Sequence, residues 1–474
     1  MTDQPASLYA ARVPIFPKRV SGTFRRLKWG IMLVTLGIYY LTPWIRWDRG
    51  PNLPDQAVLV DIAHSRFYFF WIEIWPHEFY FVAGLLIMAG LGLFLFTSAL
   101  GRVWCGYTCP QTVWTDLFIL VERWIEGDRN ARIRLHNAAW DLRKARLRLF
   151  KWAVWLLIAM ATGGAWVFYF TDAPTLARDL LTASADPIAY TTIAILTATT
   201  FVFGGFMREQ VCIYMCPWPR IQAAMMDPDT ITVAYRDWRG EPRGKHRKSA
   251  QSDQLGDCID CNACVAVCPM GIDIRDGQQM ECITCALCID ACDDIMAKVG
   301  KPRGLIDYLA LSDEPAERAG QPPRPVWQHI YRLRTIAYTA LWGAIGVGML
   351  YALFIRSDID LTVAPLRNPT FVVQSDGSVR NIYDVRLRNK LGEARVFRLS
   401  LGAETDLDIA VEGSPAQDIE IDADSTRLQR IYITAEPGAP AASQDVTELR
   451  LWVEDLASGA RASRATTFNG RVQP

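Results

Sequence analysis

The sequence is poor in histidine and carries no net charge. Its 474 residues include 5 histidines, and 50 lysines and arginines balance 50 aspartates and glutamates. A chain without a basic excess lacks the electrostatic footprint of a nucleic-acid-binding surface, so we expect no nucleic-acid partner. The histidines form no ligand-spaced pair; they are His64, His77, His136, His246 and His329. We assign none of them to a site, and a haem or copper role for His64 or His77 stays open.

The first 28 residues also lack the features of a cleavable signal peptide. They contain no early apolar run and no small-residue cleavage site. Their basic residues are Arg12, Lys18, Arg19, Arg25, Arg26 and Lys28. Because positive charge favours the cytoplasmic side of a membrane, we expect 1–28 to stay attached as a cytoplasmic segment.

Long apolar runs, by contrast, are abundant, and the chain has 17 tryptophans. Runs close to the length of a membrane-spanning helix lie at about 29–45, 79–100, 150–170, 188–207 and 336–355. They predict a multi-pass α-helical membrane protein with about five spans, of which four belong to a membrane domain at 29–207. The aromatic-rich segment 46–76 is too charged for a clean span, and we expect it in the membrane interface.

Charge and cysteine positions predict one topology. The basic loop 101–149 and the polar segment 208–334 follow the second and fourth predicted spans, which places both in the cytoplasm and 356–474 in the periplasm. All 12 cysteines then lie on the cytoplasmic side or at cytoplasmic ends of spans. Cluster-binding thiols need a reducing compartment. We therefore expect a protein of the bacterial cytoplasmic (inner) membrane, surrounded by the lipid bilayer.

Eight of the cysteines form two copies of one motif between 258 and 292. Each copy reads C-x2-C-x2-C-x3-C, the run by which bacterial-type ferredoxins hold [4Fe–4S] clusters, with the fourth cysteine serving the other cluster. Zinc sites and disulfides are the alternatives, but two complete four-cysteine runs fit zinc poorly. We predict two [4Fe–4S] clusters in a ferredoxin-like domain at about 250–310. The expected ligands are Cys258, Cys261, Cys264 and Cys292 for cluster 1, and Cys282, Cys285, Cys288 and Cys268 for cluster 2.

The other four cysteines also form a repeat. Both copies read C-x3-C-P, at Cys105 and Cys109 after the second predicted span and at Cys212 and Cys216 after the fourth. A spacing of four places both sulfurs of a pair on one face of a helical turn, which the proline then ends. The pairs could bind a metal or cluster, act as redox dithiols, or be small buried residues. Thiolates would suit Cu(I), with weaker support from the nearby Met207, Met215, Met225 and Met226.

The C-terminal part has no cysteine and changes character. Short alternating runs separated by turn residues predict about seven strands, at 370–374, 382–387, 396–401, 407–411, 419–421, 428–433 and 449–453. This pattern is typical of an immunoglobulin-like all-β sandwich without an inter-sheet disulfide. We see no catalytic constellation in it, and it could bind a partner or serve as a structural cap.

The order of these parts is more specific than any single motif. The WCGYTCPQT and CIYMCPWPR elements, the double ferredoxin motif, the last span and the immunoglobulin-like domain together resemble the cytochrome c oxidase accessory proteins of the CcoG/FixG/RdxA family. The resemblance covers essentially the whole chain. It implies a role in assembly of the cbb3-type oxidase, with its assembly factors or subunits as partners, and reduction of Cu(II) to Cu(I) for the copper centre.

The working hypothesis is a membrane-bound iron–sulfur electron-transfer protein that acts as a cupric reductase. Cys105, Cys109, Cys212 and Cys216 would bind or reduce copper, and the eight cluster cysteines would relay electrons from a quinol or a cytoplasmic reductant. The alternatives are a quinol-oxidising carrier, which the first two span-plus-motif units also resemble, and a non-enzymatic copper-delivery or assembly scaffold. A homodimer is possible in each case.

Overall fold

The computed structural model describes residues 13–50, 52–245, 255–356, 359–402, 406–414 and 417–471, the side chain of His77 excepted. The chain divides into two compact units, Met1–Ile45 with Ala57–Met349, and Arg46–Gln56 with Leu350–Pro474. The first unit contains most of the helices and all cysteines. The second contains the C-terminal sandwich.

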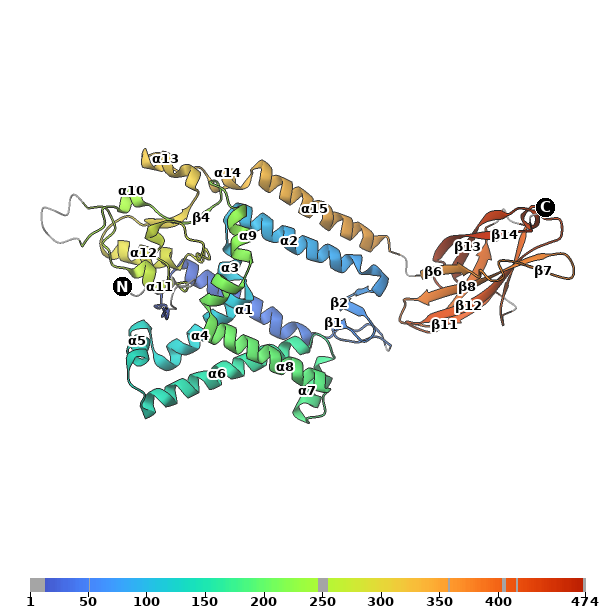
Figure 1. Ribbon diagram of the computed structural model, residues 1–474, viewed down its shortest axis with the longest axis horizontal. Helices are drawn as coiled ribbons and strands as arrows, with labels where there is room; N and C mark the ends of the chain where they lie inside the picture. The colour runs from blue at the N-terminus through green and yellow to red at the C-terminus, as the bar shows by residue number, and fades with distance from the viewer. Residues whose placement is uncertain are drawn as a thin grey trace, which may run out of the picture. The chain divides into compact units, whose positions relative to one another are not determined.

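Four helical segments in the described residues are long and apolar enough to cross a membrane (Figure 1). They are α2 (Tyr80–Leu100), α6 (Leu142–Val167), α8 (Pro187–Thr200) with its continuation η3 (Phe201–Met207), and α15 (Leu333–Phe354). On α15, Leu333 is 86% and Phe354 84% exposed. A helix that is apolar yet not covered by protein requires a lipid environment. The predicted multi-pass membrane class is therefore confirmed, with spans close to four of the predicted runs.

The first predicted run forms α1 (Thr23–Leu41) and a short turn η1 (Thr42–Trp44). This helix begins earlier than expected and includes three basic residues, so it is not among the four apolar segments. Two of them, Arg25 and Lys28, are buried and contact Asp116 of helix α4 (Pro110–Glu126) at 2.9 and 3.8 Å. The charged end of α1 thus packs against protein, and a fifth crossing stays a prediction.

The connections between these helices are ordered. The segment expected to lie in the interface forms an antiparallel sheet of β1 (Val58–Asp61), β2 (Arg66–Phe69) and β3 (Ile72–Ile74), followed by η2 (Pro76–Glu78). Two of its charged residues pair with each other across β2 and β3, Arg66 with Glu73 at 3.3 Å. The basic loop contains α3 (Val103–Tyr107), α4 (Pro110–Glu126) and α5 (Arg129–Asn137), and α7 (Ala173–Leu181) follows α6.

The polar segment between α8 and α15 carries the ferredoxin-like fold. Its elements are η4 (Val211–Met215), α9 (Trp218–Met225), β4 (Thr232–Tyr235), α10 (Asp237–Gly240), α11 (Ala263–Val267), η6 (Ile274–Asp276), α12 (Leu287–Lys298), β5 (Ile306–Leu309), η7 (Leu311–Asp313), α13 (Glu314–Arg318) and α14 (Val326–Ile330). Strands β4 and β5 pair antiparallel, and α11 packs on α12. The α1 N-terminus joins this fold, because the backbone N–H of Arg25 donates to Asp290 of α12 at 2.7 Å.

The C-terminal unit is a sandwich of two antiparallel sheets. One has the order β10-β12-β8-β6 with β7 beside β8, and the other has β11-β9-β13-β14. The strands are β6 (Ile359–Pro365), β7 (Val372–Val373), β8 (Val379–Asn389), β9 (Arg395–Leu401), β10 (Leu407–Val411), β11 (Asp418–Ile421), β12 (Thr426–Ala435), β13 (Val446–Asp455) and β14 (Arg461–Asn469), with α16 (Pro440–Ser443) before β13. Alternating residues such as Leu387, Leu399 and Leu451 are fully buried between the sheets.

The predicted immunoglobulin-like fold is confirmed, and all seven predicted strands are present. Two further strands, β6 and β14, were missed. The outer strand β14 buries only Phe468 fully and is rich in small and polar residues, so it lacks the apolar alternation on which the prediction depended.

Candidate iron-sulfur and thiolate site

The two ferredoxin motifs have the same backbone conformation. In each copy the residues on both sides of the second cysteine have φ between 52° and 59°: Asp260 and Asn262 around Cys261, Thr284 and Ala286 around Cys285. These left-handed residues turn the loop around the cysteine that they flank. Helices α11 and α12 then begin directly after them and carry Cys264 and Cys288. The sequence repeat is thus also a structural repeat.

The fourth cysteine of each motif lies near the other motif. Burial raises the pKa of Cys292 to about 12, and the neighbouring thiols that add to this shift are Cys264, Cys258 and Cys261. Burial likewise raises the pKa of Cys268 to about 12, with contributions from Cys285 and Cys282. The structure therefore brings together the two sets of four that the motif spacing predicts.

The set predicted to hold cluster 2 lines a single cavity. Cys268, Cys282, Cys285 and Cys288 all face this space, together with Cys264 of the other set and apolar side chains such as Ile272 and Leu287. The set for cluster 1 differs in exposure, because Cys261 is exposed while Cys258, Cys264 and Cys292 are buried. Four thiols around an apolar cavity fit a [4Fe–4S] cluster, whose sulfur ligands are cysteine thiolates.

The paired cysteines do not have the predicted local structure. Each pair spans the end of one helix and the start of the next, instead of a single helical turn. The first cysteine of each pair is helical: Cys105 lies in α3 and Cys212 in the π-helical turn η4. The second is extended, with ψ of 128° at Cys109 and 123° at Cys216. The physical reason is the following proline, which disfavours the helical conformation at the residue before it.

The two pairs nevertheless share an unusual backbone path. The N–H of Cys109 donates to the carbonyl of Trp104 at 3.0 Å, and that of Cys216 to the carbonyl of Val211 at 2.8 Å, so each spans five residues. Four residues before each first cysteine, the preceding helix ends at a residue with positive φ: Gly101 at 62° and Arg208 at 44°. The predicted internal repeat is therefore present in the fold.

All four paired cysteines line one cavity of about 290 Å³. Its wall also contains two arginines, Arg102 and Arg220, and the acidic Glu281. The methionines in the wall are Met270 and Met280, whereas the four methionines named from the sequence do not line it. Burial raises the pKa of Cys105 and of Cys212 to about 12, and a cation bound beside these thiols would favour their ionised form.

The cysteines are arranged around this space without meeting at one point. Within the described ranges, no three Cys, His, Asp or Glu side chains are placed to hold a single metal ion. A cubane cluster spreads its ligands over four irons, whereas a mononuclear copper site needs its thiolates to converge. Binding of one copper ion in this cavity would therefore require two or more of the four thiols to move closer to one another.

The first pair packs directly against the cluster 2 loop. A Cβ atom added to Gly106, which lies between the paired cysteines, would stand 2.6 Å from the carbonyl oxygen of Ile283 and 3.1 Å from the N and Cα of Cys285. The Tyr107 hydroxyl donates to the carbonyl of Cys285 at 3.3 Å. Cys105 and Cys212 both pack on the apolar cluster that contains Cys285. The thiolate cavity and the predicted cluster 2 are thus direct neighbours.

Three buried polar residues that the motifs did not reveal support this arrangement. Arg102 donates to the carbonyls of Met280 and Cys282 in the cluster 2 loop and to that of Pro219 after the second pair. Gln222 accepts from the Cys105 thiol at 3.1 Å and donates to Thr97 at 3.2 Å. The third is Glu122. The position of Arg102 at the end of a predicted span could have drawn attention to it. Its partners could not have been predicted, because they are distant in the sequence.

Glu122 contacts Arg208, the residue at which the chain turns before the second pair. It accepts from Arg208 at 2.6 Å, from Arg132 at 2.8 Å and from Lys151 at 3.2 Å, and all four residues are largely buried. Burial alone would raise the pKa of Glu122, but these three cations lower it to about 2. Arg208 is the strained residue at positive φ, and this ion pair fixes it in place.

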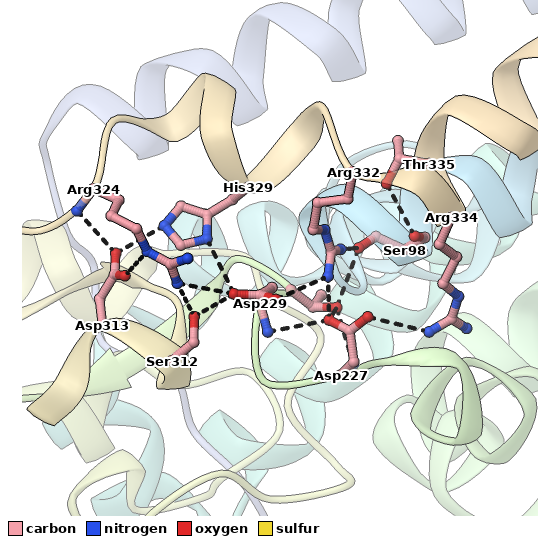
Figure 2. A network of polar contacts seen from close by, with 11 residues as sticks. Ser98, Asp227, Asp229, Ser312, Asp313, Arg324, His329, Arg332, Arg334 and Thr335 are labelled. Carbon is pink, nitrogen blue, oxygen red and sulfur yellow. Dashed lines mark hydrogen bonds and ion pairs between the residues drawn. The ribbon is translucent and has the colours of Figure 1, made fainter.

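A second polar network joins the loop after α9 to the start of α15 (Figure 2). Asp227 contacts Arg332 at 2.5 Å and Arg334 at 3.3 Å. Further along, His329 lies 2.8 Å from Asp313, which also accepts from Arg324. Because α9 directly follows the second pair, this network connects the paired-cysteine region to the last apolar helix.

The described histidine side chains lie outside the cysteine site. His329 belongs to the network just described, and His64 is an exposed residue paired with Asp61 at 2.7 Å. His136 contacts the ring of Phe16. His246 and the side chain of His77 lie outside the described residues.

Comparison with known proteins agrees with this architecture. The model of a 4Fe-4S dicluster domain matches 207–311, that of a 4Fe-4S binding domain matches 81–128, and that of the immunoglobulin-like fold at the C-terminus of FixG matches 349–471. The protein RdxB of Cereibacter sphaeroides is 70% identical over 99% of this chain and 98% of its own length. The chain belongs to the FixG/RdxA family.

Two further members support this assignment. RdxA of Cereibacter sphaeroides is 63% identical over 98% of both chains. The nitrogen fixation protein FixG of Rhizobium meliloti is 54% identical over 98% of this chain and 94% of its own length. This member of the FixG/RdxA family is thus an iron–sulfur membrane protein with two [4Fe–4S] clusters, and the chemistry of such clusters is electron transfer.

Proposed function

We propose that this protein is a cupric reductase that supplies Cu(I) for assembly of a cbb3-type oxidase. The observation that carries the proposal is the cavity lined by Cys105, Cys109, Cys212 and Cys216, which borders the predicted cluster 2 loop. Thiolates prefer Cu(I) to harder cations, so a site of this composition favours the reduced product.

The roles of the residues follow from their positions. The eight motif cysteines, in the two crossed sets of four, are the proposed cluster ligands. Clusters held there supply single electrons, and one electron converts one Cu(II) to Cu(I). Exposed Cys261 leaves one set accessible to a reductant, for which a quinol or a cytoplasmic donor is the candidate class. Arg102 and Arg220 balance the negative charge of thiolates in the cavity.

The biological setting rests on the family. Relatives in the FixG/RdxA family share the whole chain with this protein, including the immunoglobulin-like domain. Together with the resemblance to oxidase accessory proteins, this supports oxidase assembly factors or subunits as partners. The sandwich has no cysteine and no catalytic constellation, so docking to a partner is its proposed role.

The test is Cu(II) reduction by the anaerobically purified full-length protein. Double variants Cys105→Ser with Cys109→Ser, and Cys212→Ser with Cys216→Ser, are expected to lose reduction while they retain the iron of the two ferredoxin-type clusters. Thr108→Ser, which keeps both thiols of the first loop, is the matched control. Unchanged Cu(I) formation in both double variants would exclude the paired cysteines as the copper site.

A further cluster in the same cavity is a second candidate role for the paired cysteines. It is favoured by the match of 81–128, which includes Cys105 and Cys109, to a 4Fe-4S binding domain, and by the open spacing of the four thiols. Iron and sulfide analysis separates the two roles. Loss of about four irons per chain in either double variant would assign a cluster to the cavity, whereas unchanged iron with lost copper binding would assign copper.

A further inference from the structure

A second cavity lies between the N-terminal end of α1 and helix α4. It has a volume of about 490 Å³. Its charged lining consists of four arginines, Arg19, Arg25, Arg26 and Arg123, without a carboxylate. The volume is in the range of cavities that bind small ligands, and the charge selects an anion.

Most of this positive charge is not neutralised by protein. Arg25 is paired with Asp116 at 2.9 Å. Among the contacts of the described residues, Arg19, Arg26 and Arg123 form no ion pair. The guanidinium of Arg123 donates only to the backbone carbonyls of Pro17 and Lys18, and its Nε is buried without a hydrogen-bond partner.

The electrostatics of Arg123 show the same excess. Burial, together with the neighbouring Arg25 and Arg132, lowers the pKa of Arg123 to about 10, and Asp116 and Asp128 only partly offset this shift. Bringing cations together in a partly buried space is unfavourable unless an anion joins them. A bound anion would remove this cost.

The rim of the cavity is apolar and aromatic. Trp29 and Trp124 line it, and Trp124 is 71% exposed and contacts the ring of Phe150 on α6. Leu27 next to it is 50% exposed. Exposed tryptophans beside arginines are typical of the level of lipid headgroups, where an aromatic ring contacts acyl chains and a cation contacts phosphate.

We propose that this cavity binds a phosphate-bearing anion, and specifically the headgroup of an anionic phospholipid. The four arginines would contact the phosphate, and Trp29 and Trp124 the glycerol and upper acyl region. Such a site would fix α1 against α4, and the neighbouring contact of α1 with Asp290 would couple lipid binding to the ferredoxin-like fold. This inference is independent of the copper proposal, because the two cavities share no lining residue.

The experiment uses the full-length protein in detergent with spin-labelled phosphatidylglycerol as the probe and spin-labelled phosphatidylcholine as the reference. The motionally restricted fraction in the EPR spectrum reports bound lipid. We expect phosphatidylglycerol to be selected in the wild type. Arg26→Gln and Arg123→Gln should each weaken its binding about fivefold, the effect of losing about 1 kcal/mol per basic residue near an anionic surface.

Arg26 is exposed, so Arg26→Gln keeps the test valid if Arg123→Gln impairs folding. Arg134→Gln, which removes an exposed arginine of α5 outside the cavity, is the charge-matched control and should bind phosphatidylglycerol like the wild type. Inorganic phosphate in a separate titration identifies the source of the anion. Displacement of the lipid probe by millimolar phosphate would assign a free phosphate, and no displacement would assign the lipid.

Equal binding of phosphatidylglycerol and phosphatidylcholine, or equal losses in Arg26→Gln and Arg134→Gln, would overturn the proposal. The first result would show that the cavity does not select an anion. The second would show only a general effect of net charge.

Discussion

The two paired-cysteine segments share a backbone path but are held in place by different means. The first, after α2, turns at Gly101 and packs by close backbone contact against the cluster 2 loop. The second, after η3, turns at Arg208, whose backbone is strained by its positive φ and whose side chain pairs with the buried carboxylate of Glu122. The first segment thus depends on the small size of its glycines, and the second depends on a buried ion pair. A repeat in sequence therefore does not imply equal roles, and each segment can be disturbed separately.

The largest expected effect comes from Glu122→Gln. This change leaves Arg132, Lys151 and Arg208 without their shared carboxylate, and breaking a buried ion pair from one side costs about 3–5 kcal/mol. Thermal unfolding of the purified protein should show a clearly lower midpoint. Glu448→Gln on the exposed face of the sandwich is the control. A midpoint equal to that of the control would show that Glu122 does not support the second segment.

The same carboxylate predicts a pH dependence. The pKa of Glu122 in the folded protein is about 2, below its ordinary value of 4.5. A lowered pKa stabilises the fold above the ordinary value, and this stabilisation is lost as pH falls from about 4.5 towards 2. The midpoint of the wild type should therefore fall more steeply than that of Glu122→Gln over this range. Parallel curves would contradict the assignment.

Gly106→Ala tests the contact of the first segment. The added Cβ meets backbone atoms of Ile283 and Cys285, which cannot move aside as a flexible side chain can. We expect Cu(II) reduction to fall roughly 100-fold, the scale of a 1 Å displacement in a reacting assembly, while iron content is retained. Gly90→Ala in α2, where a Cβ has open space, is the control. Full activity in Gly106→Ala would mean that close contact with the cluster 2 loop is not required.

A smaller effect is expected from Gly101→Ala. With φ at 62° and ψ at −134°, this residue has a conformation that side chains rarely adopt, and Cβ would lie 3.0 Å from Thr232. The strain should cost about 1–3 kcal/mol. The loss should appear in the unfolding midpoint, with Gly30→Ala as the unstrained control. If Gly101→Ala is as stable as that control, the turn at 101 tolerates a side chain, as the turn at Arg208 does. The two segments would then not differ in their need for glycine at the turn.

Sequence reasoning identified the repeats because their information is local. Cysteine spacing, the proline after each pair and the apolar runs lie within short stretches, and the fold retains them. The extended conformation of Cys109 and Cys216 could have been predicted from the following proline, but the spacing of four was given more weight. The strand β14 was missed for lack of an apolar alternation.

The contacts that hold the paired-cysteine segments in place could not be predicted from local sequence patterns. The ion pair of Glu122 with Arg208 joins residues 86 positions apart, and the Tyr107 contact with Cys285 joins residues 178 apart. Glu122 belongs to no motif, and the motif that contains Tyr107 does not indicate its partner. Only packing brings these residues together, and packing partners at such separations leave no spacing pattern in a single sequence.

The smallest predicted effect concerns Gln222, which contacts only the first pair. Its amide accepts from the Cys105 thiol and donates to Thr97, and it is fully buried. Gln222→Leu removes these hydrogen bonds at similar size, so the fold should lose about 1 kcal/mol. The unfolding midpoint should fall by about 2–4 °C, whereas the exposed Gln321→Leu should leave it unchanged. Cu(II) reduction should fall no more than about fivefold, the equivalent of 1 kcal/mol. A loss as complete as that of the cysteine variants would instead make Gln222 part of the copper site, and the first segment would then depend on a polar ligand as well as on close packing.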